Sequence, residues 1–182
     1  MRKVAIIVCS LLLFASVASS QVPSGNVFVG YSYYNADLSS LGRSNLNGWN
    51  GSLEGKVLPW VGIVADFSGH YGSERVPTIF CQGQPCSSVS VNIHEFDFLF
   101  GPRVSVSVGK IRPFAEALFG GAHVSANRAG SDTSFATALG GGIDYHLIPL
   151  VALRLEGDYV QTRFFSATQN NVRLSTGIVL RF

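Results

Sequence analysis

Hydrophobic and polar residues alternate along most of the chain, and the final segment shows this most clearly. In residues 171–182 one side of an extended strand would carry mainly apolar residues: Val172, Leu174, Thr176, Ile178, Leu180 and Phe182. The other side would carry Asn171, Arg173, Ser175, Gly177, Val179 and Arg181. Successive side chains of a β-strand point in opposite directions, so a period of two is typical of a strand with two different faces. The pattern predicts a strand between apolar and polar surroundings.

The same alternation predicts eight strands, at residues 26–35, 47–57, 60–71, 89–106, 112–124, 134–147, 149–163 and 171–182. Each is long enough, at about 9–11 residues or more, to cross a bilayer when tilted. Three connections are tight and have a proline close by: Pro59, Pro113 and Pro149. The others, at residues 36–46, 72–88, 125–133 and 164–170, are longer and more polar. Alternating short and long connections predict an up-and-down antiparallel barrel with both termini at the short-turn end.

The N-terminal segment is typical of a secretory signal peptide. Arg2 and Lys3 precede an apolar run at residues 4–17, and the small residues Ala18 and Ser20 come before Gln21. This arrangement predicts a signal peptide at residues 1–20 and a mature barrel domain at residues 21–182. The apolar run is too short to span a bilayer as a helix.

Composition narrows the class of protein further. Charged residues make up 13% of the chain, against roughly 25% in an ordinary soluble domain. Removal of Arg2 and Lys3 reduces the 13 basic residues to 11, equal to the 11 acidic ones, so no nucleic-acid partner is expected. No mature segment has about 18 consecutive apolar residues, which excludes helical membrane spans. The sequence therefore predicts an all-β, eight-stranded antiparallel transmembrane β-barrel.

A soluble lipocalin-like barrel, with its apolar side inward, would show the same period. Three features favour an outward apolar side instead. The polar faces mix charges with very small residues, as in Gly62, Val64, Asp66 and Ser68, and such a mixture suits the crowded interior of a narrow barrel. The opposite faces carry large apolar side chains, such as Phe96, Phe98 and Phe100. Aromatic residues also mark two predicted interfacial girdles, Trp60, Phe114, Tyr145 and Phe182 at the short-turn end and Tyr31, Tyr33, Trp49, Tyr71 and Tyr159 toward the long loops.

The predicted inward faces collect thirteen charged residues: Glu54, Lys56, Asp66, Glu95, Asp97, Arg103, Glu116, Asp144, Arg154, Glu156, Asp158, Arg173 and Arg181. An unpaired charge in a dry interior would cost several kcal/mol, so we expect these residues to pair across the barrel. Eight strands enclose no open channel, which favours a plugged polar core over the alternative of a gated ion path. Three of the four histidines, His70, His94 and His146, are expected at rims or loop bases and not as metal ligands.

Two cysteines lie in the longest predicted loop. Cys81 and Cys86 enclose four residues, and the exported compartment is oxidising, so we predict a disulfide that closes the tip of this loop. The alternative, a metal site, is disfavoured because no pair of histidines lies nearby.

Several segments together resemble a known family, the small eight-stranded outer-membrane barrels of the OmpA-like, porin-family type in Gram-negative bacteria. They are residues 27–33, 101–103, 112–118, 140–144 and the final strand. The resemblance implies a place in the outer membrane, in contact with its lipid and lipopolysaccharide. It also implies that Leu180 and Phe182, at the end of the closing strand, belong to the signal that the barrel-assembly machinery recognises.

Some eight-stranded outer-membrane lipid A deacylases use a histidine and a serine spaced as in His123 and Ser125, together with a carboxylate. A serine nucleophile needs a base that is oriented by an acid. The following strand offers no carboxylate on the same face, and Asp132 is placed in the loop, so no catalytic residue is assigned.

The function expected from these features is physical and needs no cofactor. We expect a monomeric barrel that supports membrane integrity and makes surface contacts through its outer loops, with an extracellular ligand as a possible partner. A narrow porin-like channel is the first alternative, and a lipid A-modifying enzyme is the second.

Overall fold

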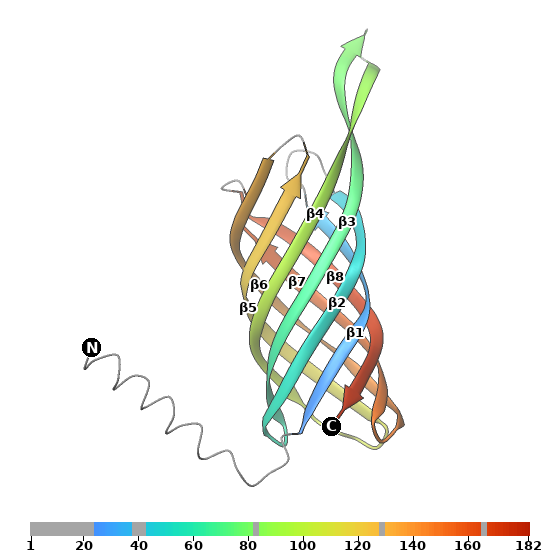
Figure 1. The fold of residues 1–182 in the computed structure, drawn as a ribbon, viewed down its shortest axis with the longest axis vertical. Helices are drawn as coiled ribbons and strands as arrows, with labels where there is room; N and C mark the ends of the chain where they lie inside the picture. Colours follow the sequence, from blue (N-terminus) through green and yellow to red (C-terminus); the bar gives the residue numbers. More distant parts are fainter. Residues whose placement is uncertain (1–23, 38–42, 82–83, 128–129, 165–166) are drawn as a thin grey trace, which may run out of the picture.

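The chain forms a closed barrel of eight antiparallel strands (Figure 1). The computed structural model describes residues 24–37, 43–81, 84–127, 130–164 and 167–182, with the backbone alone for residues 74–81 and 84–89. The strands are β1 Gly25–Asp37, β2 Arg43–Leu58, β3 Val61–Cys81, β4 Gln84–Ser105, β5 Ile111–Ala126, β6 Gly130–Ile148, β7 Val151–Thr162 and β8 Gln169–Arg181. The predicted signal peptide, residues 1–20, lies outside the described residues. Within these ranges, no helix is both long and apolar enough to cross a membrane.

The barrel closes between its first and last strands. β1 pairs antiparallel with β8, from Asn26 opposite Arg181 to Asn35 opposite Val172. Beyond this ladder, the Gly25 and Phe182 backbones exchange two hydrogen bonds of 2.9 and 3.1 Å. Since each strand pairs with a neighbour on both sides within the closed wall, the backbone of the wall can lie in lipid without unsatisfied polar groups. The predicted fold class, an eight-stranded antiparallel barrel, is confirmed.

The three connections at the end that holds the C-terminus are tight turns. Between β4 and β5, Val108 and Ile111 exchange backbone hydrogen bonds of 2.8 and 3.1 Å across two residues. Gly109, the first of these two residues, has a φ of +62°. Two-residue hairpins require positive φ in their turn, which explains the glycine here.

At the opposite end the strands continue farther than the alternation indicated. The predicted loop at residues 72–88 consists largely of strand, because β3 and β4 stay paired out to Cys81 and Gln84. The predicted loops at residues 36–46 and 125–133 also shorten, since strands β1, β2, β5 and β6 extend into them. Hairpin pairing persists outside the membrane, where no apolar face is needed and alternation therefore fades. The connections predicted at this end were long mainly because they included the outer ends of the strands.

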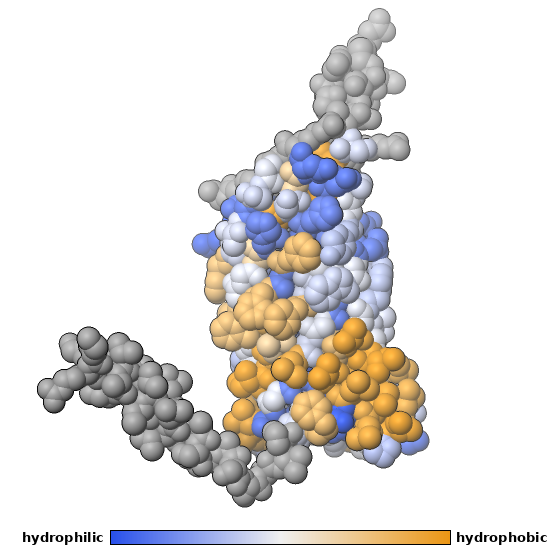
Figure 2. Space-filling view, viewed as in Figure 1, coloured by the Kyte–Doolittle hydropathy of each residue, from blue (hydrophilic) through white to orange (hydrophobic). Residues whose placement is uncertain are grey.

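Exposed and buried positions alternate along the strands as the pattern predicted. Large apolar side chains, among them Val29, Ile63, Phe98, Leu139 and Ile178, are exposed on the outer wall. On the face seen in Figure 2, apolar residues gather nearer the short-turn end and hydrophilic residues toward the opposite end. An exposed apolar belt of this extent suits lipid and not water. The structure thus excludes the soluble alternative with the apolar side inward.

One aromatic residue assigned to the girdles was misplaced. Trp60, Tyr145 and Phe182 are exposed at the short-turn end, but Phe114 is only 7% exposed and faces the interior. Its ring lies 4.4 Å from Cζ of Arg103 and 4.5 Å from Cζ of Arg154. Phe114 shares its parity along β5 with the buried Glu116, and this parity decides its direction whatever its distance from the turn.

Candidate functional site in the barrel interior

Four buried arginines dominate the interior, namely Arg103, Arg112, Arg154 and Arg173. Each comes from a different strand, and each lies within 4.0 Å of at least one carboxylate. Inward-facing positions of a narrow barrel hold side chains at van der Waals contact, so charges from opposite walls meet in the middle. Such contacts could not be assigned to particular pairs from the strand pattern alone.

Arg154 forms the most regular of these pairs. Its Nε and Nη2 donate to the two carboxylate oxygens of Asp144, at 2.7 and 2.9 Å. The two residues lie directly opposite each other on β7 and β6. The guanidinium also stacks over Phe28, at 5.1 Å, and Phe114, so its donors and its flat faces are both engaged.

Arg103 links three carboxylates from different strands. Its guanidinium lies 2.5 Å from Glu116, 3.2 Å from Glu156 and 3.4 Å from Glu54. In the same region Lys56 contacts Glu54 at 2.8 Å. One fork-shaped cation therefore ties β4 to three other strands, β2, β5 and β7.

Arg173 pairs with two carboxylates that lie farther toward the outer end of the barrel. Its guanidinium lies 2.7 Å from Asp66 and 2.9 Å from Asp158, and Nη1 also donates to Ser68 at 3.1 Å. Asp158 lies directly opposite Arg173 on the neighbouring strand, whereas Asp66 reaches it from the distant strand β3. The contact between β8 and β3 crosses the lumen.

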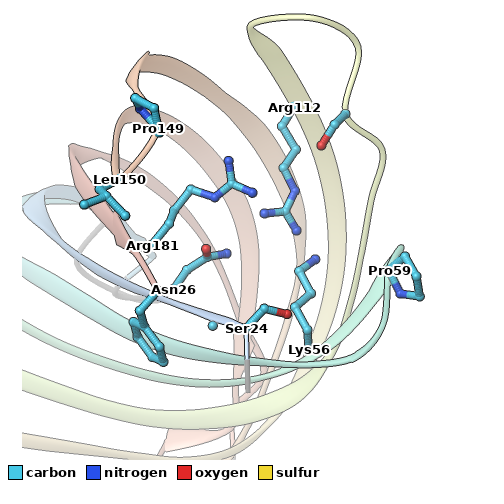
Figure 3. A pocket seen from close by; sticks show the side chains of 11 residues that line it. Ser24, Asn26, Lys56, Pro59, Arg112, Pro149, Leu150 and Arg181 are labelled. Carbon is cyan, nitrogen blue, oxygen red and sulfur yellow. The ribbon is translucent and has the colours of Figure 1, made fainter. Parts of the chain in front are cut away.

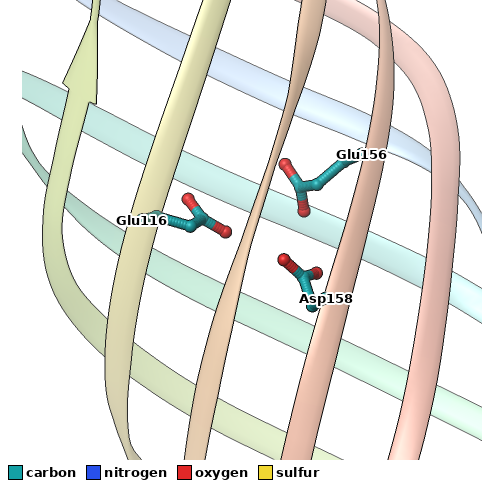
Figure 4. A group of neighbouring side chains, drawn as sticks. All are labelled: Glu116, Glu156 and Asp158. Carbon is teal, nitrogen blue, oxygen red and sulfur yellow. The ribbon is translucent and has the colours of Figure 1, made fainter.

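Three buried carboxylates gather between Arg103 and Arg173. Figure 4 shows the carboxylates of Glu116, Glu156 and Asp158 grouped together. One oxygen from each lies within 4.8 Å of the others. Among the described residues, these three carboxylates form the one group whose spacing could hold a metal ion. However, Arg103 already contacts Glu116 and Glu156, and Arg173 contacts Asp158. The two guanidiniums supply the positive charge that such a cluster requires, so we assign no metal.

Glu95 and Asp97 lie nearer the outer end of the barrel than these three carboxylates. Neither forms an ion pair with an arginine among the described residues. Glu95 accepts a hydrogen bond of 3.0 Å from the Tyr34 hydroxyl, and Asp97 accepts one of 3.0 Å from Ser68. His70 lies 4.0 Å from Asp97. The expectation that every inward charge pairs with an opposite one was therefore too simple, since neutral donors serve these two carboxylates.

His70 itself is a correction, because it was expected at a rim. It is fully buried, stacks on the Tyr34 ring at a centroid distance of 4.5 Å, and its Nε2 lies 2.9 Å from Ser32 Oγ. His70 has the same strand parity as Asp66 and Ser68, a signal that could have placed it inside. His94, by contrast, is exposed against the edge of Tyr71.

An apolar layer fills much of the outer half of the interior. Its buried members include Leu46, Leu99, Leu118, Ala136 and Val160. These residues come from five strands and pack as one cluster. The outer half of the interior therefore combines this apolar cluster with the buried polar residues His70, Glu95 and Asp97.

Arg112 is the functional residue that the sequence reasoning missed. It is 3% exposed, donates to Ser105 at 2.6 Å and lies 3.4 Å from Glu54. Its parity matches Glu116, but its position beside the tight turn hid its inward direction. Arg181, which was expected to pair inside, instead donates to Nε2 of His146 at 2.6 Å.

The possible catalytic group around His123 does not come together. Nδ1 of His123 lies 2.7 Å from the Thr133 hydroxyl. Asp132 is opposite Val124 in the β5–β6 register, whereas Ser125 is opposite Ser131. Neighbouring positions face opposite sides of a strand, so Asp132 projects on the other face from His123 and Ser125.

The remaining predicted residues are placed as follows. Cys81 and Cys86 have described backbones only, so their disulfide remains a prediction. Leu180 and Phe182 are exposed on the outer wall beside the closing seam. Their role in assembly also remains a prediction.

The closed barrel, its apolar wall and its charged interior define the class of protein, an eight-stranded membrane-spanning β-barrel. The chain belongs to a family described as the outer membrane protein beta-barrel domain, which matches residues 5–182. Its location is the outer membrane. No significant match was found among curated proteins.

The solved structures that share this fold include two bacterial surface proteins. Neisserial surface protein A (NspA) has a TM-score of 0.66 at 16% identity, over 87% of this chain and 97% of that one. Ail, the attachment invasion locus protein of Yersinia pestis, solved with the heparin analogue sucrose octasulfate, has a TM-score of 0.59 at 15% identity. That match covers 89% of this chain and all of Ail. At such identities the likeness concerns the fold alone.

Proposed function

We propose that this outer-membrane barrel has a structural and surface role, with an interior that is plugged and does not conduct. The observation that carries the proposal is the network of four buried arginines, each held by carboxylates from other strands. An ion crossing the lumen would have to break these contacts and then pass the apolar cluster that includes Leu99 and Leu118. Both barriers are costly in a low-dielectric interior.

Single-channel recording in planar bilayers tests this role. We expect no reproducible conductance steps from the purified, folded barrel, while an open porin in the same bilayer gives them. Reproducible large steps from the folded protein would favour the narrow-channel alternative and overturn the plugged interior. Gel mobility before and after boiling should establish that the recorded sample is folded.

We propose also that the barrel does not modify lipid A. The separation of Asp132 from His123 and Ser125 by strand parity supports this, as does the hydrogen bond between His123 and Thr133. Mass spectrometry of lipid A from cells with and without the protein should show identical acylation. An acyl chain lost in the presence of the protein, and retained with Ser125→Ala, would identify an enzyme instead.

Surface contacts would come from the hairpin of β3 and β4. β2 pairs with β3 only as far as Tyr71, and β5 pairs with β4 only as far as Ile93. Beyond these points β3 and β4 pair with each other alone, and Figure 1 shows the hairpin projecting past the other strands. A two-stranded ribbon that extends from the membrane offers unpaired backbone edges to an extracellular partner.

Shortening the hairpin tests this part of the proposal. Ser73 and Asn92 are opposite each other in the register, so residues 74–91 can be replaced by an Asn-Gly turn. Whole cells bearing the full or the shortened hairpin would be compared for adhesion to surfaces with and without heparin. Heparin is chosen because a heparin analogue is bound in the Ail structure. We expect adhesion to fall several-fold at equal surface levels. Equal adhesion of the two forms would remove the hairpin from the proposal.

A further inference from the structure

A cationic cavity opens at the short-turn end of the barrel, away from the hairpin. Its volume is about 330 Å³, and its polar lining includes Ser24, Asn26, Lys56, Ser107, Arg112 and Arg181. Figure 3 shows the nitrogen-bearing ends of Lys56, Arg112 and Arg181 directed into this cavity, between the turns that carry Pro59 and Pro149. Three cations from β2, β5 and β8 thus converge on one space.

Among the side chains that line this cavity three are cationic, Lys56, Arg112 and Arg181, and none is a carboxylate. Glu54 is the carboxylate beneath it, and it lies 2.8 Å from Lys56 and 3.4 Å from Arg112. The Arg103 guanidinium also lies 3.4 Å from the Glu54 carboxylate. Asp144, opposite Arg112 in the register, is already engaged by both donors of Arg154. One carboxylate is therefore shared among several cations.

Arg181 adds a further unbalanced charge. Among the described residues it forms no ion pair with a carboxylate, and its described partner is Nε2 of His146 at 2.6 Å. A guanidinium can only donate, so this histidine nitrogen must accept, and the imidazole in this contact is neutral. The pair of Arg181 and His146 keeps its full positive charge.

An apolar groove adjoins the cationic cavity on the outer wall. The two spaces share Ser24, Gly25 and Phe182. The groove continues over the lipid-facing side chains of Leu53 and Ile63 and has a volume of about 430 Å³. A ligand that carries an anionic group at one end and a hydrocarbon chain at the other would match both spaces.

We propose that this cavity binds the phosphate of an anionic phospholipid from the periplasmic leaflet, with an acyl chain along the adjoining groove. Ammonium, guanidinium, hydroxyl and amide donors surround the cavity, and tetrahedral phosphate oxygens can accept from several such donors at once. The short-turn end of an outer-membrane barrel lies on the periplasmic side. The cavity at this end is therefore at the depth of the phospholipid headgroups of the periplasmic leaflet. A site of this kind would fix the barrel's height in the bilayer.

Native mass spectrometry of the folded barrel tests the proposal. Protein in detergent would be offered equal amounts of phosphatidylglycerol and phosphatidylcholine, and we expect retained lipid to be mainly phosphatidylglycerol. Arg181→Gln should lower this retention about tenfold, the loss expected for one charge-assisted hydrogen bond. Lys56→Gln provides a second, independent variant. Arg43→Gln is the charge-matched control at the opposite end of the barrel, where Arg43 contacts Asn35, and it should retain lipid as the unaltered protein does.

The remaining outcomes separate the possible sources of phosphate. Millimolar glycerol 3-phosphate should displace little lipid if the groove contributes, whereas complete displacement would make the site one for soluble phosphate esters and overturn the lipid assignment. Equal retention of both lipids, or an equal loss in Arg43→Gln, would overturn the site itself. Heat-dependent gel mobility of each variant establishes that the barrel is folded.

Discussion

Removal of the Arg154 guanidinium should destabilise the barrel far more than its small size suggests. Arg154→Met leaves the 2%-exposed carboxylate of Asp144 without its bidentate partner. Breaking a buried pair on one side costs about 3–5 kcal/mol. Lost stacking over Phe28 and Phe114 adds about 1 kcal/mol. We therefore expect the free energy of unfolding to fall by about 4–6 kcal/mol.

A second substitution should recover much of this loss. In Arg154→Met with Asp144→Leu, no unpaired carboxylate remains at this position, while Glu156 keeps its contact with Arg103 at 3.2 Å. The two single changes should therefore be non-additive, with a coupling energy of at least about 2 kcal/mol. Arg43→Gln, at an exposed position, should change stability by no more than about 0.5 kcal/mol.

Denaturant unfolding in detergent micelles measures these values. The fluorescence of Trp49 and Trp60, the two tryptophans of the chain, reports the transfer of the outer wall from micelle to water. If the losses of the two single variants simply add, with coupling below about 0.5 kcal/mol, the pairing argument for the interior is refuted. A stability loss under about 1 kcal/mol for Arg154→Met would refute it equally.

Three further predictions concern packing, redox state and assembly. Gly142→Val should strongly reduce the folded fraction on gels, because a Cβ there would lie 2.2 Å from the Leu155 carbonyl oxygen, whereas Gly55→Ala, with open space, should fold normally. Alkylation of native protein should find no free thiol at Cys81 or Cys86, and two labelled cysteines would disprove the disulfide. Phe182→Ala should lower the amount of barrel in the outer membrane several-fold by immunoblot, and an unchanged level would remove Phe182 from the assembly signal.

The interior network also bears on the proposed role. Arg103 and Arg173 tie the strands of the barrel together across the lumen, and this makes its wall rigid. A rigid wall suits a protein that anchors a projecting hairpin on one side and contacts lipid phosphate on the other. The hairpin at one end and Arg181 at the other can be altered without removing any of the ion pairs described for Arg103 or Arg173, so the two proposals can be tested separately.

The sequence by itself determined the number, direction and two-faced character of the strands. A period of two is a local property, so it places Arg173 and Ile178 on opposite faces without any knowledge of the rest of the chain. The lipid-facing wall followed as well, because its only requirement is an apolar side chain at every second position. Where parity was set aside in favour of distance from a turn, as for Phe114, Arg112 and His70, the predictions failed.

The tertiary structure alone decided which charges meet. The contact between Arg173 and Asp66 joins residues 107 positions apart, from strands that are not neighbours in the sheet. Such contacts depend on barrel closure and on the stagger of strands, which no local pattern specifies. The same reason applies to the cationic cavity, since Lys56, Arg112 and Arg181 share one space only because the three strands that carry them are brought together around one barrel end.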